Sequence, residues 1–88
     1  MKILVTCGNG CGSSLIVEMK IKSLLEKYNI TAEVDHCDLA TAKTTSADVY
    51  VGSLELIEQL DYKDKIMVGL INILDEEEIT EKLINRIN

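Results

Sequence analysis

The chain alternates four short apolar runs with segments of helical character, and this alternation restricts the folds open to it more than any other feature. The apolar runs are rich in Ile, Leu and Val and predict β-strands over Lys2–Thr6, Ile30–His36, Ala47–Val51 and Ile66–Leu70. Strands that are joined by helices run parallel, and right-handed crossovers leave few topologies. We therefore expect an α/β fold, namely a three-layer α/β/α sandwich with a four-stranded parallel sheet of Rossmann-like type.

The segment with the clearest helical pattern follows a glycine-rich stretch. Its apolar residues recur at helical spacing: Val17, Ile21, Leu24, Leu25 and Tyr28. A hydroxyl at Ser13 or Ser14 would accept one of the N–H groups that the first turn leaves free. Shorter helices are expected behind Asp38, Ser53 and Asp75, and a glutamate three residues after the last of these has the spacing of a capping box.

Length, charge and cysteine usage limit the setting. The 88 residues carry a formal net charge of −6, and a chain of this length forms one domain, residues 1–88. The absence of a basic cluster with interleaved aromatic residues argues against nucleic acid as a partner. Since no apolar run approaches the ~20 residues of a transmembrane helix, we expect a cytoplasmic protein without membrane insertion. Its three cysteines are then reduced thiols.

The stretch that carries the chemistry is CGNGCGSS, between the first predicted strand and the first long helix. It consists of Cys7, Gly8, Asn9, Gly10, Cys11, Gly12, Ser13 and Ser14. A dinucleotide site requires G-x-G-x-x-G, but Ser13 stands where the third glycine belongs, although Asp35 lies at a suitable distance to hold a ribose hydroxyl. The chain is also only half of what a dinucleotide normally needs, and the stretch lacks the lysine of a Walker loop. Both nucleotide interpretations therefore fit poorly.

A metal or redox site is the next alternative, because Cys7 and Cys11 stand close together. Structural zinc usually takes two close pairs of ligands. The remaining candidates, His36 and Cys37, are adjacent at a predicted strand end and would point opposite ways. A thioredoxin-like site expects Cys-x-x-Cys, which is not the spacing here. We expect no metal and no cofactor, and we interpret His36 as a surface or strand-end residue and Cys37 as a packing or strand-end residue.

A covalent phosphate site fits the stretch better. A thiol at the end of a strand, followed by a glycine-rich arc and a helix N-terminus, lies beneath backbone N–H groups that bind a phosphate dianion and favour a thiolate. Tyrosine-phosphatase loops use this geometry with Cys-x5-Arg, but here Ser13 takes the place of the arginine. Without the guanidinium, such a loop would cleave an unactivated ester poorly, yet it could accept a phosphoryl group from a reactive donor. The pattern favours phosphoryl relay over hydrolysis.

The motif CGNG-x-GSS, followed by the Met/Lys-bearing helix at residues 18–20, resembles the signature of the IIB components of the bacterial sugar phosphotransferase system. Within that family it is most similar to the L-ascorbate type of the galactitol/ascorbate group. The resemblance covers nearly the whole chain, including the segments at residues 36–37, 47–48 and 68–72.

This resemblance implies that Cys7 is phosphorylated by a phosphohistidine of the IIA component. The phosphoryl group then passes to a sugar, L-ascorbate or galactitol, held by the membrane component IIC, and residues 8–14 bind the phosphate. Cys11 departs from the family, in which a non-thiol residue is common at this position.

The alternative to a phosphoryl carrier is a small phosphatase-like or thiol redox enzyme that uses Cys7. Met19 and Met67 are interpreted as core residues.

Overall fold

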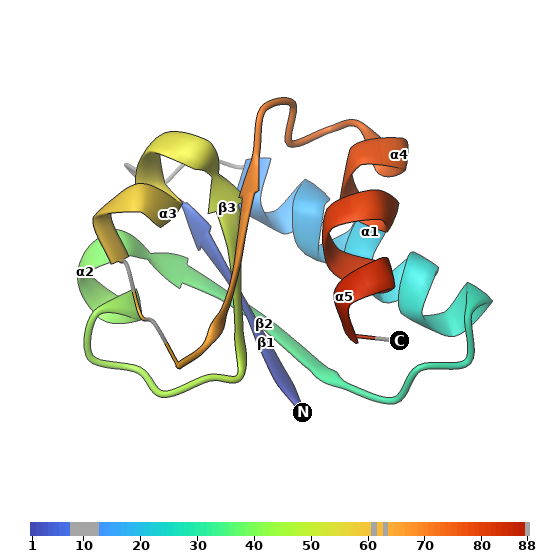
Figure 1. Cartoon of the computed structure of the whole chain (residues 1–88), viewed down its shortest axis with the longest axis horizontal. Helices are drawn as coiled ribbons and strands as arrows, with labels where there is room; N and C mark the ends of the chain where they lie inside the picture. The colour runs from blue at the N-terminus through green and yellow to red at the C-terminus, as the bar shows by residue number, and fades with distance from the viewer. Residues whose placement is uncertain (8–12, 61, 63, 88) are drawn as a thin grey trace.

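The computed structural model describes residues 1–7, 13–60, 62 and 64–87. Its four strands are β1 (Lys2–Cys7), β2 (Glu33–Asp38), β3 (Val49–Ser53) and β4 (Ile66–Leu70). They form a parallel sheet in the order β2-β1-β3-β4 (Figure 1). The predicted four-stranded parallel sheet is therefore confirmed.

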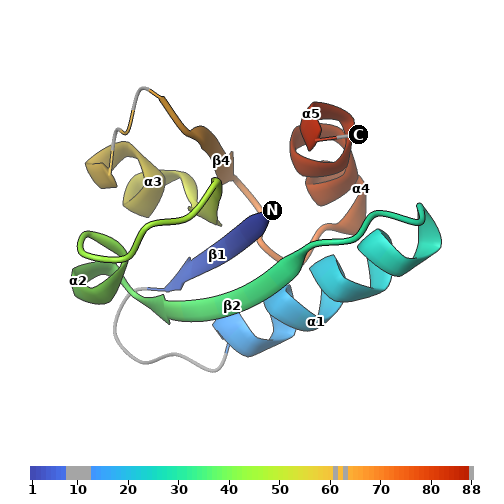
Figure 2. The same cartoon turned by 90° about the horizontal axis from the view of Figure 1, so that it is seen from below.

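Helices cover both faces of the sheet. They are α1 (Ser13–Lys27), α2 (Leu39–Ala42), α3 (Leu54–Leu60), α4 (Glu76–Ile79), the π-helical turn η1 (Thr80–Ile84) and α5 (Asn85–Ile87). The first helix and the C-terminal segments α4, η1 and α5 lie on one face, whereas α2 and α3 lie on the other (Figure 2). This arrangement is the expected three-layer sandwich. Among the described residues, no helix is both long and apolar enough to cross a membrane.

Two buried apolar clusters hold the helices to the sheet, because successive side chains of a strand point to opposite faces. Ile3 and Val5 of β1 join the larger cluster, which also contains Ile21 of α1. Leu4 joins the smaller cluster on the other face, together with Tyr50 of β3. Because β1 has a neighbouring strand on each side and a helical layer on each face, its carboxyl end is held from all four directions.

The start of β2 differs from the predicted range. The strand begins at Glu33 rather than Ile30, because the turn after α1 uses the residues between. Asn29 adopts a left-handed conformation (φ 56°), and the Ile30 N–H donates to the Leu25 carbonyl at 2.8 Å, which closes the helix. At its other end β2 continues to Asp38, two residues beyond the predicted boundary.

The start of β3 also differs, and the reason is a tyrosine hydroxyl. The Tyr50 side chain accepts a hydrogen bond from the Ala47 N–H at 3.1 Å and donates one to the Thr45 carbonyl at 2.6 Å. These bonds organise a turn where the sequence predicted the first strand residue. The strand therefore begins at Val49 and runs to Ser53.

Candidate functional site

The carboxyl ends of the strands form the edge at which a parallel α/β sheet binds its ligands. β1 reaches this edge at Cys7, which pairs with Asp38 of β2. β3 reaches it at Ser53 and β4 at Leu70. Since β2 lies on one side of β1 and β3 on the other, the topological switch point lies between β1 and β3. Cys7 ends its strand beside that point.

The predicted phosphate loop connects β1 to α1. Cys7 closes the strand and Ser13 opens the helix, whose N-terminus lies at the same edge of the sheet (Figure 2). Residues 8–12 and the side chains of residues 7, 13 and 14 lie outside the described part of the structure. The structure thus brings Cys7 and the helix N-terminus to one edge, and the phosphate-binding roles of residues 8–14 stay a prediction.

Gly52 permits the close approach of β1 and β3 beside Cys7. It pairs with Thr6, and a Cβ atom at Gly52 would lie 2.7 Å from the Thr6 carbonyl oxygen. The Thr6 side chain is itself buried, and its hydroxyl has no hydrogen-bond partner in the described ranges. The residue that precedes Cys7 is therefore tightly enclosed, which fixes the backbone at the end of β1.

Cys37, whose thiol lies in the described part of the structure, has the character of a packing residue. It is partly buried at the end of β2 and packs against the cluster that contains Leu4. Burial raises the pKa of the Cys37 thiol, and the carboxylates of Asp38 and Asp35 raise it further. A raised pKa keeps a thiol protonated and unreactive. The structure thus agrees with the expected role of Cys37.

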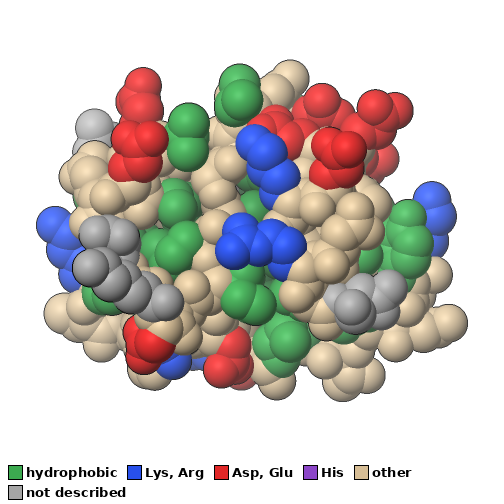
Figure 3. Space-filling model, viewed as in Figure 1, with side chains coloured by type: hydrophobic (Ala, Val, Ile, Leu, Met, Phe, Trp, Pro, Cys, Tyr) green, Lys and Arg blue, Asp and Glu red, His purple; other side chains and the backbone are tan. Residues whose placement is uncertain are grey.

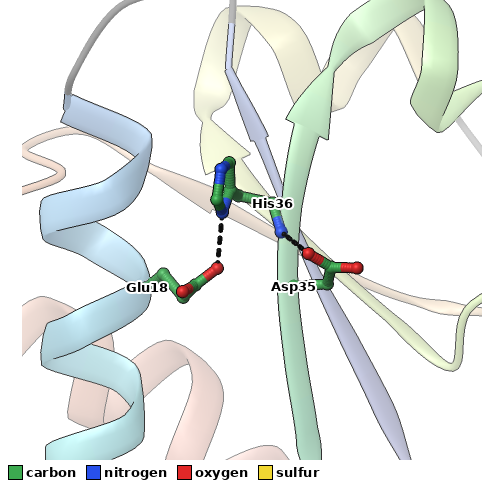
Figure 4. A group of neighbouring side chains, drawn as sticks. All are labelled: Glu18, Asp35 and His36. Atoms are coloured by element: carbon green, nitrogen blue, oxygen red, sulfur yellow. Dashed lines mark hydrogen bonds and ion pairs between the residues drawn. The ribbon is translucent and has the colours of Figure 1, made fainter.

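The sequence did not predict the buried carboxylate of Glu18 near this edge. Glu18 of α1 is 7% exposed, and its carboxylate lies 2.6 Å from His36 Nδ1 and 3.2 Å from Lys22 Nζ (Figure 4). Burial acts to raise the pKa of Glu18, but the hydrogen bonds from His36 and Lys22 outweigh it and lower the pKa below its ordinary value. The carboxylate is therefore ionised at neutral pH. The one sequence signal was its place beside Val17 and three residues before Ile21, on the apolar face of the helix.

Glu18, Asp35 and His36 together offer ligand atoms within 4.8 Å of one another, which raises the question of a metal centre. Figure 4 shows the Asp35 carboxylate on the opposite side of β2 from Glu18, where it accepts a hydrogen bond from the His36 backbone N–H at 2.8 Å. The Glu18 carboxylate is already shared by the His36 ring and the Lys22 ammonium. A cation would have to displace Lys22 from Glu18 and the His36 backbone N–H from Asp35, so these residues fit a hydrogen-bonded pair better than a metal centre.

The loop that follows β4 is held at the same edge by Glu78. Its carboxylate accepts hydrogen bonds from the N–H groups of Ile71 (2.6 Å) and Asn72 (2.8 Å) and from Lys82 Nζ (2.6 Å). The bond from Lys82, followed by those from the two backbone groups, lowers the pKa of Glu78 to about 2. One carboxylate thus fixes the first two residues after β4.

The predicted capping box at the start of α4 is only half formed. Asp75 caps the helix as expected, since its side chain accepts from the N–H groups of Glu77 (3.0 Å) and Glu78 (3.5 Å). The reciprocal bond is replaced, because the Asp75 N–H donates to the Asn72 carbonyl. The Glu78 carboxylate is engaged by the loop after β4 and does not return to Asp75.

Large apolar side chains are exposed near this edge of the sheet. On the first turns of α1, Leu15, Ile16 and Met19 are about half exposed or more, and Ile71 after β4 is 81% exposed. The expectation that Met19 fills the core is therefore wrong, since its position turns away from the sheet, whereas Met67 packs against the smaller cluster. Figure 3 shows acidic side chains gathered over α4 beside this edge.

Comparison with known proteins finds relatives over almost the whole chain. The family described as the lactose/cellobiose-specific IIB subunit of the PTS system matches residues 2–85. The ascorbate-specific PTS system EIIB component of Mycoplasma pneumoniae is 30% identical over 86 residues, which cover 94% of this chain and 90% of that protein. The proteins of the same name from Salmonella typhimurium and Escherichia coli O157:H7 are 32% identical over 87 residues, covering 96% of this chain and 86% of theirs. The matched region includes every strand of the sheet and the helix that follows Cys7.

Proposed function

The chain belongs to the IIB subunit family of the phosphotransferase system, and from this premise we propose that it is a phosphoryl carrier that works through Cys7. The thiol accepts a phosphoryl group from a phosphohistidine of a IIA component and passes it to a sugar held by a membrane IIC component. The chain acts in this way as one phosphotransferase domain, residues 1–88, in the cytoplasm.

The observation that carries the proposal is the junction of β1 with α1. Cys7 ends a buried strand, and α1 begins at Ser13 at the same edge of the sheet. The positive end of a helix dipole and the free N–H groups of its first turn favour an anion, whether a thiolate or a phosphate. The first turn of α1 holds no acidic residue that would oppose this effect.

Each proposed transfer exchanges one bond to phosphorus for another. In the first, the Cys7 sulfur attacks phosphorus, the S–P bond forms, and the P–N bond breaks. The departing imidazole nitrogen of the IIA histidine keeps the electron pair and takes up the proton that the Cys7 thiol gives up on ionisation. In the second, a sugar hydroxyl oxygen attacks phosphorus, the O–P bond forms, and the S–P bond breaks to regenerate the thiolate. The hydroxyl proton passes to a base in the sugar site of the partner. Atoms and charge balance without a further reactant.

We assign phosphate binding to residues 8–14. Glycines at three of these positions let a phosphate approach the backbone N–H groups closely, and the hydroxyls of Ser13 and Ser14 add hydrogen bonds. Ser13 replaces the arginine that a hydrolytic loop uses to stabilise the transition state of ester cleavage. This composition supports a role in carrying phosphate rather than in hydrolysis.

We propose L-ascorbate as the sugar. The relatives that match at 30% and 32% identity are named as ascorbate-specific components, whereas the family description names lactose and cellobiose. Because the IIC component holds the sugar, the comparison to make is phosphoryl transfer to ascorbate against transfer to galactitol, lactose and cellobiose in membranes that contain the matching IIC. Transfer to another sugar in preference to ascorbate would refute this part of the proposal.

Intact-mass measurement tests the assignment of Cys7. Wild-type protein, Cys7→Ser and Cys37→Ala are incubated with a phosphorylated ascorbate-type IIA component. We expect one phosphoryl adduct on the wild type and on Cys37→Ala, and none on Cys7→Ser, because a serine hydroxyl is hardly ionised near neutral pH. An adduct of equal yield on Cys7→Ser would show that another residue is the nucleophile.

The same incubation separates the carrier from the alternative enzyme. A carrier holds its phosphoryl group until a sugar acceptor is added. Steady release of inorganic phosphate without an accumulating adduct would instead indicate a phosphatase-like use of Cys7.

A further inference from the structure

The Glu18–His36 contact joins the two elements that flank the predicted phosphate loop (Figure 4). Glu18 lies five residues into α1 from Ser13, or ~7.5 Å along the axis at ~1.5 Å per residue. His36 pairs with Val5 of β1, two residues before Cys7. The contact therefore ties the first two turns of α1 to the strand beside β1, near the carboxyl end of β1.

Glu18 occupies a place where an apolar residue would serve stability at least as well. It is 7% exposed on the face of α1 that packs against the sheet. Removing a carboxylate from water costs free energy that its partners offset only in part, so apolar replacement of a buried charge is often neutral or stabilising. The side chains of His36 and Lys22 are 45% and 55% exposed, so both would keep contact with water if Glu18 were lost. Net stability is thus a poor explanation for this carboxylate.

The Glu18–His36 hydrogen bond constrains the orientation of α1, which apolar packing does not. Apolar packing of α1 on the sheet is non-directional, whereas a hydrogen bond of 2.6 Å between Glu18 Oε1 and His36 Nδ1 sets the distance and the rotation of the helix relative to β2. The other carboxylate oxygen contacts Lys22 one turn further along α1, which holds the Glu18 side chain in place. The Asp35 carboxylate accepts its hydrogen bond from the His36 backbone N–H, so the His36 ring is left to Glu18.

We propose that Glu18 and His36 form a positioning pair that fixes the first turns of α1 against β2 and so sets the reactivity of the Cys7 thiol. This proposal rests on the function proposed for Cys7. The effect of a helix N-terminus on an anion falls off within about one turn. A small displacement of α1 therefore removes much of its influence, and we expect the thiolate fraction at neutral pH to fall about two- to fivefold when the pair is broken.

Alkylation of Cys7 measures this effect without any partner protein. The other two cysteines are replaced by alanine, so that iodoacetamide reports on Cys7 alone. Glu18→Met keeps the side-chain volume but removes the carboxylate, and Glu18→Gln keeps an acceptor for the His36 N–H. For each variant the alkylation rate at pH 7 is compared with the midpoint of thermal unfolding, and phosphoryl transfer from a phosphorylated IIA component is measured in parallel.

A matched control comes from a second ion pair of the same helix. Lys20 lies 3.6 Å from Glu76, which connects α1 to α4 rather than to β2. Glu76→Gln removes this exposed contact and should leave the alkylation rate of Cys7 unchanged. A fall of equal size in this control would overturn the proposal, because the loss of any ion pair made by α1 would then have the same effect.

The proposal requires stability and reactivity to separate. In Glu18→Met, we expect the thermal midpoint to stay or rise while the alkylation rate falls about two- to fivefold, and in Glu18→Gln we expect more of the rate to survive. A full rate in Glu18→Met, or a fall that merely follows a lower thermal midpoint, would overturn the proposal. If alkylation falls as expected but the wild type accepts no phosphoryl group, the positioning role stands and the proposed carrier function fails.

Discussion

Gly52→Ala tests how tightly the strand that bears Cys7 is enclosed. The added Cβ would lie 2.7 Å from the Thr6 carbonyl oxygen and 3.5 Å from Ile57 Cδ1. The carbonyl belongs to the β1–β3 ladder, in which Thr6 pairs with Gly52, so it cannot rotate away and the two strands must separate. Overpacking of this kind costs about 1–3 kcal/mol, and alanine recovers ~0.5–1 kcal/mol through its smaller entropy loss on folding.

The expected net loss is about 0.5–2 kcal/mol of the free energy of unfolding. In a chain of 88 residues, each ~1 kcal/mol lowers the thermal midpoint by about 4–8 °C, so Gly52→Ala should unfold about 2–16 °C below the wild type. Circular dichroism during thermal and urea unfolding measures both quantities.

Gly69→Ala is the matched control, since Gly69 pairs with Gly52 across β3 and β4. Its Cβ would also lie 2.7 Å from a neighbour, but that atom is Leu54 Cδ1, at the end of a side chain that is 43% exposed. The nearest backbone atom, Leu54 Cα, is 3.1 Å away, so that it has to move less than the Thr6 carbonyl oxygen does in Gly52→Ala. We expect a change within about 1 kcal/mol. Wild-type stability in Gly52→Ala, or a larger loss in Gly69→Ala than in Gly52→Ala, would refute the claim that the Thr6 carbonyl is immovable.

Three further predictions concern Glu78, Asp75 and the proposed phosphate loop. The pKa of Glu78 is lowered from 4.5 to about 2, so the contribution of this carboxylate to stability is present above about pH 5 and declines as the pH falls toward 2. The urea midpoints of the wild type and Glu78→Gln should therefore converge in acid, and a difference that is undiminished near pH 2 would contradict this. Asp75→Ala should lower the free energy of unfolding by ~1 kcal/mol through loss of the α4 cap, and an unchanged urea midpoint would show that the cap contributes nothing. Phosphoryl transfer should fall about two- to tenfold in Ser13→Ala, the effect of one neutral hydrogen bond, but far more in Gly10→Val, because a β-branched residue resists the positive φ angles that the proposed arc requires. If the rate of phosphoryl transfer fell more in Ser13→Ala than in Gly10→Val, the loop would be working through a side chain.

The features that the sequence predicted well depend on local signals. The apolar run Ile66–Leu70 follows a polar segment and coincides with β4, and the glycine-rich stretch before a periodic segment placed the start of α1 at Ser13. The start of β2 was predicted less well, because it depends on how Asn29 closes the preceding helix. A boundary set by a turn is visible only once the backbone conformation of that turn is known.

The spacing of residues in the sequence did not predict which side chains bond to groups in distant loops. The interval between Asp75 and Glu78 indicated a capping box, but the Glu78 carboxylate meets the N–H groups of Ile71 and Asn72, which the fold brings to it from the end of β4. In the same way, the periodicity of α1 did not show that Met19 turns outward while Glu18 turns inward. A helical pattern identifies the apolar face, but it does not tell which polar residue at the margin of that face will find a partner.

The demands on a carrier thiol explain why a fixed helix would be useful beside Cys7. In the proposed reaction the same sulfur is the nucleophile when it accepts the phosphoryl group and the leaving group when the sugar takes it. A lower thiol pKa increases the thiolate fraction for the first step and makes sulfur a better leaving group in the second. One structural device, a helix N-terminus held at a fixed position, therefore assists both transfers. A directional contact such as that between Glu18 and His36 can maintain this position through both encounters with a partner, whereas apolar packing alone would let the helix shift when a partner binds.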